Sequence, residues 1–295
     1  MSLFLLAPTV MAQGKPAPAT GAEACKECHE ENFNQFAATR HANKKVAGMP
    51  GEYGACSACH GDASEHVKSK GGKTGAMIPL ASKMVPAEER NAVCMNCHNT
   101  SKRIHWNMSA HDARGVACVN CHQVHTTHDR VMDKAAQSDV CFTCHKDVRV
   151  QTFKPSRHPI QEGKVSCADC HSTHGSSGPK MMKRDTVNDT CFQCHMEKRG
   201  PFLWNHQPVT EDCAICHNPH GSTNDSMLRQ RSPFLCQSCH EGTSHRGNAP
   251  STRFGNMSDE LGVGVTLARG CTACHTAIHG GNNPTNNSGS RSFRR

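Results

Sequence analysis

The residues best suited to chemistry in this chain are its cysteines, which recur in one pattern. All 20 Cys lie in ten copies of C-x-x-C-H, and none is left over. Two thiols three positions apart share one helical turn, so both can add to the vinyl groups of one haem. The next residue, His, is then carried under the ring, where its imidazole can bind the iron. The ten motifs are Cys25-Cys28-His29, Cys56-Cys59-His60, Cys94-Cys97-His98, Cys118-Cys121-His122, Cys141-Cys144-His145, Cys167-Cys170-His171, Cys191-Cys194-His195, Cys213-Cys216-His217, Cys236-Cys239-His240 and Cys271-Cys274-His275.

Other uses of paired cysteines fit this pattern poorly. A zinc ribbon does not require a His directly after each second Cys. A thioredoxin-like redox pair occurs once in a fold, and a disulfide scaffold of this density is normally a much shorter chain. Full use of every Cys in C-x-x-C-H therefore predicts ten covalently bound haem c groups.

Each haem iron has a second axial position, and the remaining histidines are numerous enough to fill it. Twelve of the 22 His lie outside the motifs. Six of them flank motifs in an internal repeat, and four more flank the first two motifs or the last. The ten candidate distal ligands are His41, His66, His111, His125, His158, His174, His206, His220, His245 and His279. His105 and His128 are surplus and are predicted to contact propionates or to lie on the surface.

Ten distal His would leave every iron six-coordinate. A haem enzyme needs an open coordination site and neighbouring acid–base groups, so the ligand count predicts an electron-transfer protein and not an enzyme. Met is an alternative axial ligand, and the chain has 13 of them. Because enough His are present, the Met side chains are interpreted as packing residues.

The spacing of the motifs predicts how the haems are arranged. First cysteines follow one another at intervals of 22 to 26 residues through the middle of the chain and at 31 to 38 near its ends. Within this region a unit of 45 to 50 residues repeats, each unit carrying two motifs and two free His. So little chain between haems favours an extended, haem-packed array.

The composition leaves the polypeptide without an adequate apolar core. Leu, Ile, Val and Phe make up 41 of 295 residues, about 14%, below the roughly 20% at which chains tend to be disordered. Ten porphyrins would supply the missing apolar surface, so haem attachment and folding are predicted to be coupled.

The formal net charge of +8 is offset once haems are counted. A ferric haem with two ionised propionates carries about −1, so ten of them bring the protein to about −2. With aromatic residues at only 4%, the basic balance does not indicate a nucleic-acid partner.

The ends of the chain differ from its middle. Residues 1–12 contain a short apolar run and a Val10-Met11-Ala12 sequence typical of a cleavage site, which predicts the remnant of a signal peptide. A membrane anchor is the alternative, but the run is too short to span a bilayer. Residues 13–22 are a Pro/Ala/Gly linker, and residues 281–295 form a flexible basic tail. An exported protein suits haem attachment outside the cytoplasm.

Regular structure is predicted to be sparse. Short helices are expected at His29–Arg40, at Pro86–Cys97 and around several motifs, with coil elsewhere because Gly, Pro, Asn and Ser are frequent. No alternating pattern predicts a sheet. The expected fold class is therefore a multihaem cytochrome c, mostly coil with short α-helices and little or no β structure.

Several segments resemble one known family. They are SRHP at Ser156–Pro159, RGPF at Arg199–Phe202, NHQPVTEDCAICHNPHGS at Asn205–Ser222, TSHRG at Thr243–Gly247 and ARGCTACHTAIHG at Ala268–Gly280. Together with the ten motifs they are similar to the MtrA/DmsE/PioA decahaem cytochromes over nearly the whole chain after residue 22.

The resemblance implies a periplasmic protein that inserts into an outer-membrane β-barrel porin. There it would conduct electrons between periplasmic or inner-membrane cytochromes and an extracellular multihaem cytochrome or other acceptor. It also implies an elongated fold of two pentahaem halves, here 23–150 with the first five motifs and 151–280 with the last five. On the residues alone, a subunit of an extracellular haem filament and a multihaem reductase or its electron donor remain open.

Overall fold

The structure is a computed structural model that describes residues 21–43, 50–51, 54–240, 271–273 and 275–282. The expected signal segment, most of the linker, the tail beyond 282, His245 and Cys274 lie outside the described residues. The chain divides into two compact units. Unit 1 comprises Met1–Asn99 with Gly115–Asp129, and unit 2 comprises Thr100–Arg114 with Arg130–Arg295.

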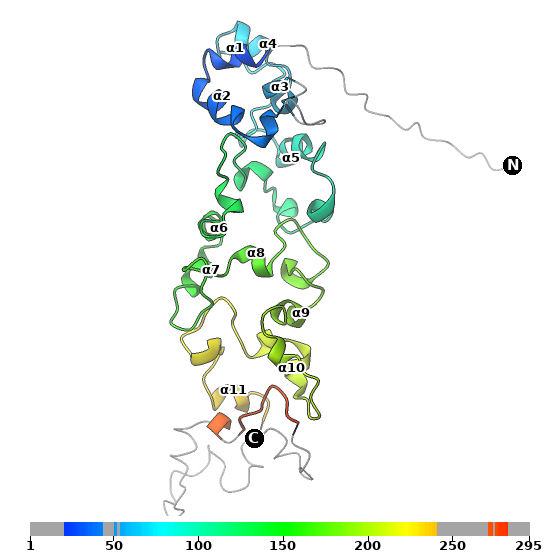
Figure 1. Cartoon of the computed structure of the whole chain (residues 1–295), viewed down its shortest axis with the longest axis vertical. Helices are drawn as coiled ribbons and strands as arrows, with labels where there is room; N and C mark the ends of the chain where they lie inside the picture. Colours follow the sequence, from blue (N-terminus) through cyan, green and yellow to red (C-terminus); the bar gives the residue numbers. More distant parts are fainter. Residues whose placement is uncertain (1–20, 44–49, 52–53, 241–270, 274, 283–295) are drawn as a thin grey trace, which may run out of the picture. The chain divides into compact units, whose positions relative to one another are not determined.

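Unit 1 is built from short helices joined by turns and coil (Figure 1). None of them exceeds nine residues, which is too short for a helix to be stable without tertiary contacts. The helices are α1 (Ala22–Lys26), α2 (Glu30–Ala37), α3 (Cys56–His60), α4 (Ser64–Lys68) and α5 (Ala87–Met95), with 3₁₀ turns η1 (Arg40–Ala42) and η4 (Cys118–Asn120).

Unit 2 repeats this construction with still shorter elements. In Figure 1 its helices descend from α6 to α11 in nearly the order of the sequence. The helices are α6 (Gln137–Phe142), α7 (Lys146–Gln151), α8 (Cys167–Cys170), α9 (Val187–Cys191), α10 (Gln207–Glu211) and α11 (Phe234–Gln237). The 3₁₀ turns are η2 (Ser101–Arg103), η3 (Asp112–Arg114), η5 (Arg130–Met132), η6 (Pro179–Met181), η7 (Met196–Lys198), η8 (Cys213–Ile215), η9 (Asp225–Met227) and η11 (Cys271–Ala273). Among the described helices of both units, none has the length and apolar content needed to cross a bilayer.

The two helices expected by range are present. Helix α5 begins directly after Pro86, and proline is favourable there because the N–H groups at a helix start have no partner within the helix. Two Glu in its first turn interact favourably with the helix dipole. Helix α2 ends at Ala37, earlier than predicted. The Thr39 hydroxyl donates to the Phe36 carbonyl and Thr39 is extended, so a side chain takes over a carbonyl at the helix end.

Strand pairing among the described residues is limited to isolated bridges. The bridges are Ser156–Ser222, His171–Met182, Trp204–Gly281 and His217–Leu228, all within unit 2. The expected fold class, short helices and coil without a sheet, is confirmed. The bridges at His171 and His217 occupy the same place in successive copies of the sequence repeat, so the repeat is also a structural one.

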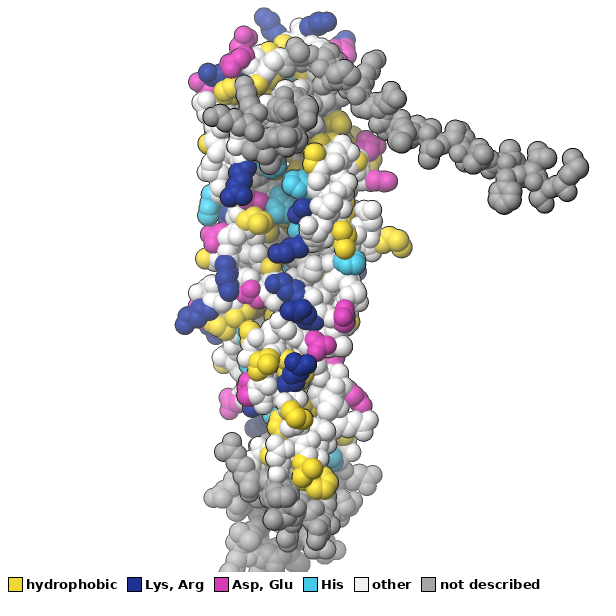
Figure 2. All heavy atoms as spheres, turned by 45° about the vertical axis from the view of Figure 1, so that its right-hand side comes forward, with side chains coloured by type: hydrophobic (Ala, Val, Ile, Leu, Met, Phe, Trp, Pro, Cys, Tyr) yellow, Lys and Arg dark blue, Asp and Glu magenta, His cyan; other side chains and the backbone are white. Residues whose placement is uncertain are grey.

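The apolar core of the described residues is small. Its buried hydrophobic side chains are Ala63, Leu80, Trp106, Ala117, Phe142, Ile160 and Met182. Larger apolar side chains are instead exposed, with Met84 at 91% and Met108 at 92%. On the face shown in Figure 2, hydrophobic side chains lie scattered among charged ones, and His side chains are visible at the surface. A core of this size cannot offset the entropy of ordering so long a chain.

The compact units do not carry equal numbers of motifs. The first four motifs belong to unit 1 and the last six to unit 2. The division into two pentahaem halves, with its boundary between residues 150 and 151, stays a prediction.

The small core leads to a prediction about the haem-free chain. Synthesised without haem attachment, the polypeptide should show no cooperative thermal transition by circular dichroism and little amide protection, whereas the holoprotein should show both. A cooperative transition of the haem-free chain would contradict the conclusion that the protein lacks a core of its own.

Candidate haem-binding sites

Each motif folds as a single helical turn. In nine of the ten, the backbone N–H of the motif His donates to the carbonyl of the first Cys, at 2.8 to 3.0 Å. The remaining motif, Cys56–His60, is helix α3 itself. The turn brings the two Cys onto one side and carries the His directly after them, as covalent attachment of one haem requires.

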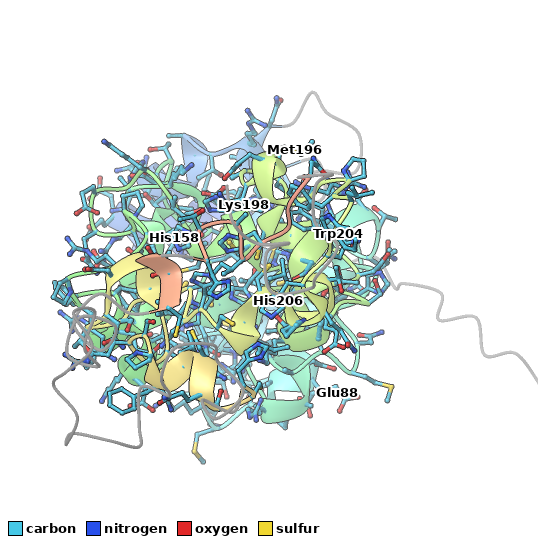
Figure 3. All side chains as sticks on the ribbon, turned by 90° about the horizontal axis from the view of Figure 1, so that it is seen from below. Glu88, His158, Met196, Lys198, Trp204 and His206 are labelled. Carbon is cyan, nitrogen blue, oxygen red and sulfur yellow. The ribbon has the colours of Figure 1, made fainter. Side chains whose placement is uncertain are left out.

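Eight motif histidines each face a histidine from outside the motifs. The distances between ring centroids all lie between 5.9 and 6.3 Å. In unit 1 the pairs are His29–His66, His98–His41 and His60–His125. In unit 2 they are His145–His111, His195–His158, His171–His220, His240–His206 and His217–His279. His158 and His206 are labelled among the side chains in Figure 3.

This separation has a direct chemical meaning. A metal–imidazole bond is about 2 Å long, so two such bonds in line through one iron separate the nitrogens by about 4 Å and the ring centroids by about 6 Å. The separation stays nearly constant although the interplanar angle varies from 14° to 82°, as expected where a metal bond sets the distance and leaves the ring orientation open. Each pair is spaced to receive one iron.

Hydrogen bonds orient eight of the candidate ligands in the described part of the chain. In each of these bonds the ring atom is Nδ1, which leaves Nε2 free of that bond and available to a metal. The acceptors are backbone carbonyls for His60 (Ile78), His66 (Lys73), His111 (Thr173), His158 (Pro219), His171 (Lys180), His206 (Ile278) and His217 (Ser226), at 2.7 to 3.1 Å. For His122 the acceptor is the Asp129 carboxylate, at 2.7 Å.

Burial favours the neutral form of several of these rings. It lowers the pKa of His125, His171, His206, His220 and His279 below the usual value for imidazole. A neutral imidazole with Nδ1–H donated keeps its lone pair on Nε2, which is the form that binds a metal.

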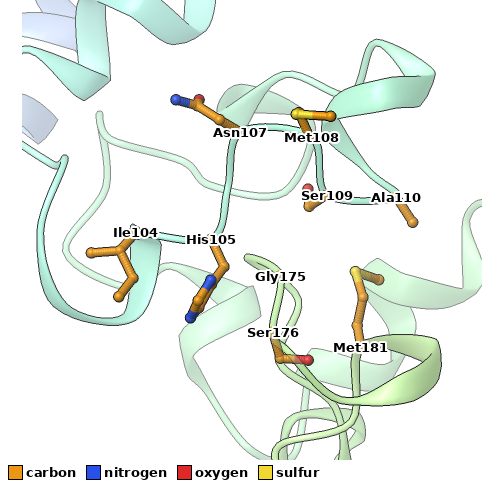
Figure 4. A pocket seen from close by; sticks show the side chains of 9 residues that line it. All are labelled: Ile104, His105, Asn107, Met108, Ser109, Ala110, Gly175, Ser176 and Met181. Carbon is orange, nitrogen blue, oxygen red and sulfur yellow. The ribbon is translucent and has the colours of Figure 1, made fainter.

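The other histidines fall in different surroundings. The ring of His174 lies 6.2 Å from that of Trp106, and His245 is outside the described residues. His105, one of the two surplus histidines, lines a cavity of about 300 Å³ in unit 2 with Met108, Ser176 and Met181 (Figure 4). His128 follows in the same segment as His122, where its N–H donates to Thr126.

The cysteines of successive motifs lie next to one another in unit 1. Cys25 and Cys56, the first cysteines of motifs one and two, lie close enough for Cys25 to raise the pKa of the Cys56 thiol. The second cysteine of motif two, Cys59, lies within electrostatic range of Cys94 in motif three. Cys94 in turn lies beside Cys118 of motif four, which lowers the pKa of the Cys94 thiol. The first four attachment points thus follow one another in space as in sequence.

Unit 2 continues the same alternation. First cysteines lie close enough for their thiols to interact in the pairs Cys141–Cys167, Cys191–Cys213 and Cys236–Cys271. Second cysteines lie within electrostatic range in Cys170–Cys194 and Cys216–Cys239. Motifs five to ten therefore form a second ordered run of neighbours.

Buried asparagines tie neighbouring motifs together. Asn91, three residues before Cys94, accepts from the Cys118 N–H at 2.8 Å and donates to the Val116 carbonyl. Asn188, three residues before Cys191, does the same for the Cys213 N–H at 2.7 Å. Both asparagines are less than a tenth exposed, and the backbone groups that they bond belong to half-buried residues, so these bonds satisfy polar groups that have little access to water. They fix the paired first cysteines side by side.

A buried arginine beside the motifs also suits a bound haem. Arg90 is 6% exposed, and its Nε has no hydrogen-bond partner. A buried guanidinium nitrogen is costly without an anionic or polar acceptor. Haem propionates are acceptors of the required charge, so the donor set here suits the group that the cysteines and histidines would hold.

Comparisons with known proteins agree with this geometry. The family described as doubled CXXCH motif matches residues 158–200 and 206–245, and that of NrfB-like c-type cytochromes matches residues 56–136. The cytochrome c554 and c-prime family matches residues 24–50. The multiheme cytochrome MtrA of Shewanella baltica (strain OS185) is 40% identical over 281 residues, which cover 93% of this chain and 82% of that protein.

The chain belongs to the MtrA family of multihaem c-type cytochromes. It is also 27% identical over 151 residues to the cytochrome c-type protein NrfB of Escherichia coli O6:H1 (strain CFT073), covering 49% of this chain and 66% of NrfB. Membership of the MtrA family makes it an electron-transfer protein that carries haem c.

One functional residue was not apparent from the sequence. Asp129 is the hydrogen-bond acceptor of His122, but a single Asp seven residues after a motif His is not distinctive. The backbone carbonyls that accept from the other rings have no sequence signal at all, because every residue has a carbonyl. Their positions depend on the turns that follow each motif.

The ring pairs predict the effect of removing one distal candidate. His220→Ala should leave the iron beside His171 with one protein ligand, so the oxidised protein should gain one high-spin ferric haem per chain by electron paramagnetic resonance. His105→Ala is the matched control, since His105 faces no motif His, and its spectrum should stay entirely low-spin. A low-spin His220→Ala protein would contradict the assignment of that pair.

Proposed function

We propose that the chain binds ten haem c groups and passes electrons along them in chain order. The observation that carries the proposal is the ordered neighbourhood of the attachment cysteines, from motif one to four in unit 1 and from five to ten in unit 2. Haem iron, once bound, supplies the one-electron chemistry. The polypeptide's part is to hold neighbouring attachment points close, so that each transfer is short.

The proximal ligands proposed are the ten motif histidines. The distal ligands proposed are His41, His66, His111, His125, His158, His206, His220 and His279, on the strength of the ring pairs, together with His174 and His245. With every iron bound by two imidazoles, no haem is open to a substrate, so we propose transfer without catalysis.

The proposed path runs between the periplasm and the cell exterior, inside an outer-membrane β-barrel porin. The resemblance to the MtrA/DmsE/PioA cytochromes is the basis for this. A hydrocarbon layer of about 30 Å is too thick for one electron-transfer step, whereas closely spaced haems divide it into short ones. A porin wall would also enclose a chain whose own apolar core is small.

The partners proposed follow from this location. They are the porin, an extracellular multihaem cytochrome at one end, and periplasmic or inner-membrane electron-transfer cytochromes at the other. Because the proposed axial ligands are two histidines at every haem, they favour neither direction of electron flow.

A vesicle experiment tests the proposal. Lipid vesicles carrying an outer-membrane porin of the type that accompanies MtrA-family cytochromes, with the holoprotein inserted, are loaded with ferricyanide. Dithionite added outside should bleach the internal ferricyanide rapidly. Vesicles with the porin alone, or with the cytochrome alone, should bleach only at the slow leakage rate.

Three results would overturn the conduit. Bleaching no faster than with porin alone would show that the chain does not conduct across the bilayer. Spontaneous assembly of the purified holoprotein into long polymers that the porin cannot bind would favour a filament subunit. A stoichiometric high-spin haem with substrate turnover would favour a reductase.

A further inference from the structure

One axial histidine is held differently from the others described. The Nδ1 of His122, in motif four, donates to Oδ2 of Asp129 at 2.7 Å. The other oxygen of that carboxylate, Oδ1, accepts from the backbone N–H of Gln123 at 3.3 Å. Seven other axial candidates among the described residues donate Nδ1 to uncharged backbone carbonyls, whereas His122 donates Nδ1 to a group with a full negative charge.

The internal repeat provides equivalent positions for comparison. His171 donates to the carbonyl of Lys180, and the next residue, Ser172, donates its N–H to the carbonyl of Met181. The same two bonds recur from His217 to Ser226 and from Asn218 to Met227. In motif four the two oxygens of Asp129 take the place of these two successive carbonyls.

The sequence explains why the first copy departs from the other two. The turn after His171 contains Gly175 and the turn after His217 contains Gly221, with φ of +94° and +136° that suit glycine. The corresponding residue after His122 is Thr126, whose branched side chain disfavours such a φ. Without that turn the chain does not bring backbone carbonyls to the ring, and the Asp129 side chain supplies the acceptor.

The His122–Asp129 contact is also partly shielded from water. The side chains are 30% and 18% exposed. His195 offers a useful contrast, because its Nδ1 lies 3.7 Å from the Glu197 carboxylate, beyond hydrogen-bonding distance, and both side chains are more than half exposed. A charge in that setting is screened by solvent and has little effect on the ring.

We propose that Asp129 is a positioning residue that lowers the reduction potential of the haem at Cys118 and Cys121 relative to the haems of the equivalent motifs at Cys167 and Cys213. A carboxylate acceptor strengthens the Nδ1–H hydrogen bond and makes Nε2 a stronger donor to iron. A stronger donor, with a nearby negative charge, stabilises ferric over ferrous iron. The proposal rests on the haem ligation given under the proposed function.

The consequence is an energetic step at a defined place in the chain. As the solution potential is lowered, the haem of motif four would be reduced after those of motifs six and eight. An electron would therefore reside on it less than on the haems of motifs six and eight.

Redox titration of the holoprotein, followed by electron paramagnetic resonance, tests the proposal. In Asp129→Asn one low-spin signal should change its g-values and be reduced at a higher potential than in the wild type, with the other haems unchanged. Asp129→Glu, which keeps the charge, should restore the lower potential at least in part. Glu197→Gln is the matched control and should leave the potential of the haem at Cys118 and Cys121 unchanged.

An Asp129→Asn titration that superimposes on the wild type, with all haems attached, would overturn the proposal. So would conversion of one haem to the high-spin state without a change in the others, since Asp129 would then only hold His122 in place. Either result leaves the proposed conduit intact, because the wild-type ligand set and its vesicle activity are measured independently of this variant.

Discussion

Two imidazole rings about 6 Å apart, with at least one of the two held through Nδ1 in seven of the eight pairs, are the arrangement on which this structure depends. The eight pairs join segments distant in sequence, as in His206 with His240 and His217 with His279. Their distances leave room for one metal ion with two bonds in line. An iron in each pair would tie these segments together more strongly than the few buried side chains do. With iron bound, the paired histidines would therefore be strong long-range links of the fold as well as ligands.

The same arrangement accounts for the composition. A chain with so few large apolar residues, and with Met84 and Met108 almost fully exposed, has little to bury apart from its cofactors. The polypeptide instead supplies turns, caps and backbone hydrogen bonds that place thiols and imidazoles. Asn91 and Asn188 are examples, since the side chain of each joins two motifs by hydrogen bonds to backbone groups. Electron transfer and folding would thus both require closely spaced haem attachment sites along the sequence.

Much of this could be predicted because the chemistry imposes its own spacing. C-x-x-C-H specifies the attachment turn, and the sparse pattern correctly indicated short helices without a sheet. The partner of each motif His could not be predicted. His125 faces His60 and not the motif beside it, and His279 faces His217 although it lies next to motif ten. Turns between motifs decide these pairings, and the carbonyls that orient the rings, such as Thr173 and Pro219, belong to residues of any type.

If the paired histidines are the two axial ligands of one iron, low-temperature magnetic circular dichroism of the oxidised holoprotein, quantified per chain against haem and protein content, should reveal it. We expect ten low-spin ferric haems, all with the charge-transfer band of two histidine ligands. A stoichiometric contribution from high-spin haem, or from iron bound by His and Met, would contradict this ligation.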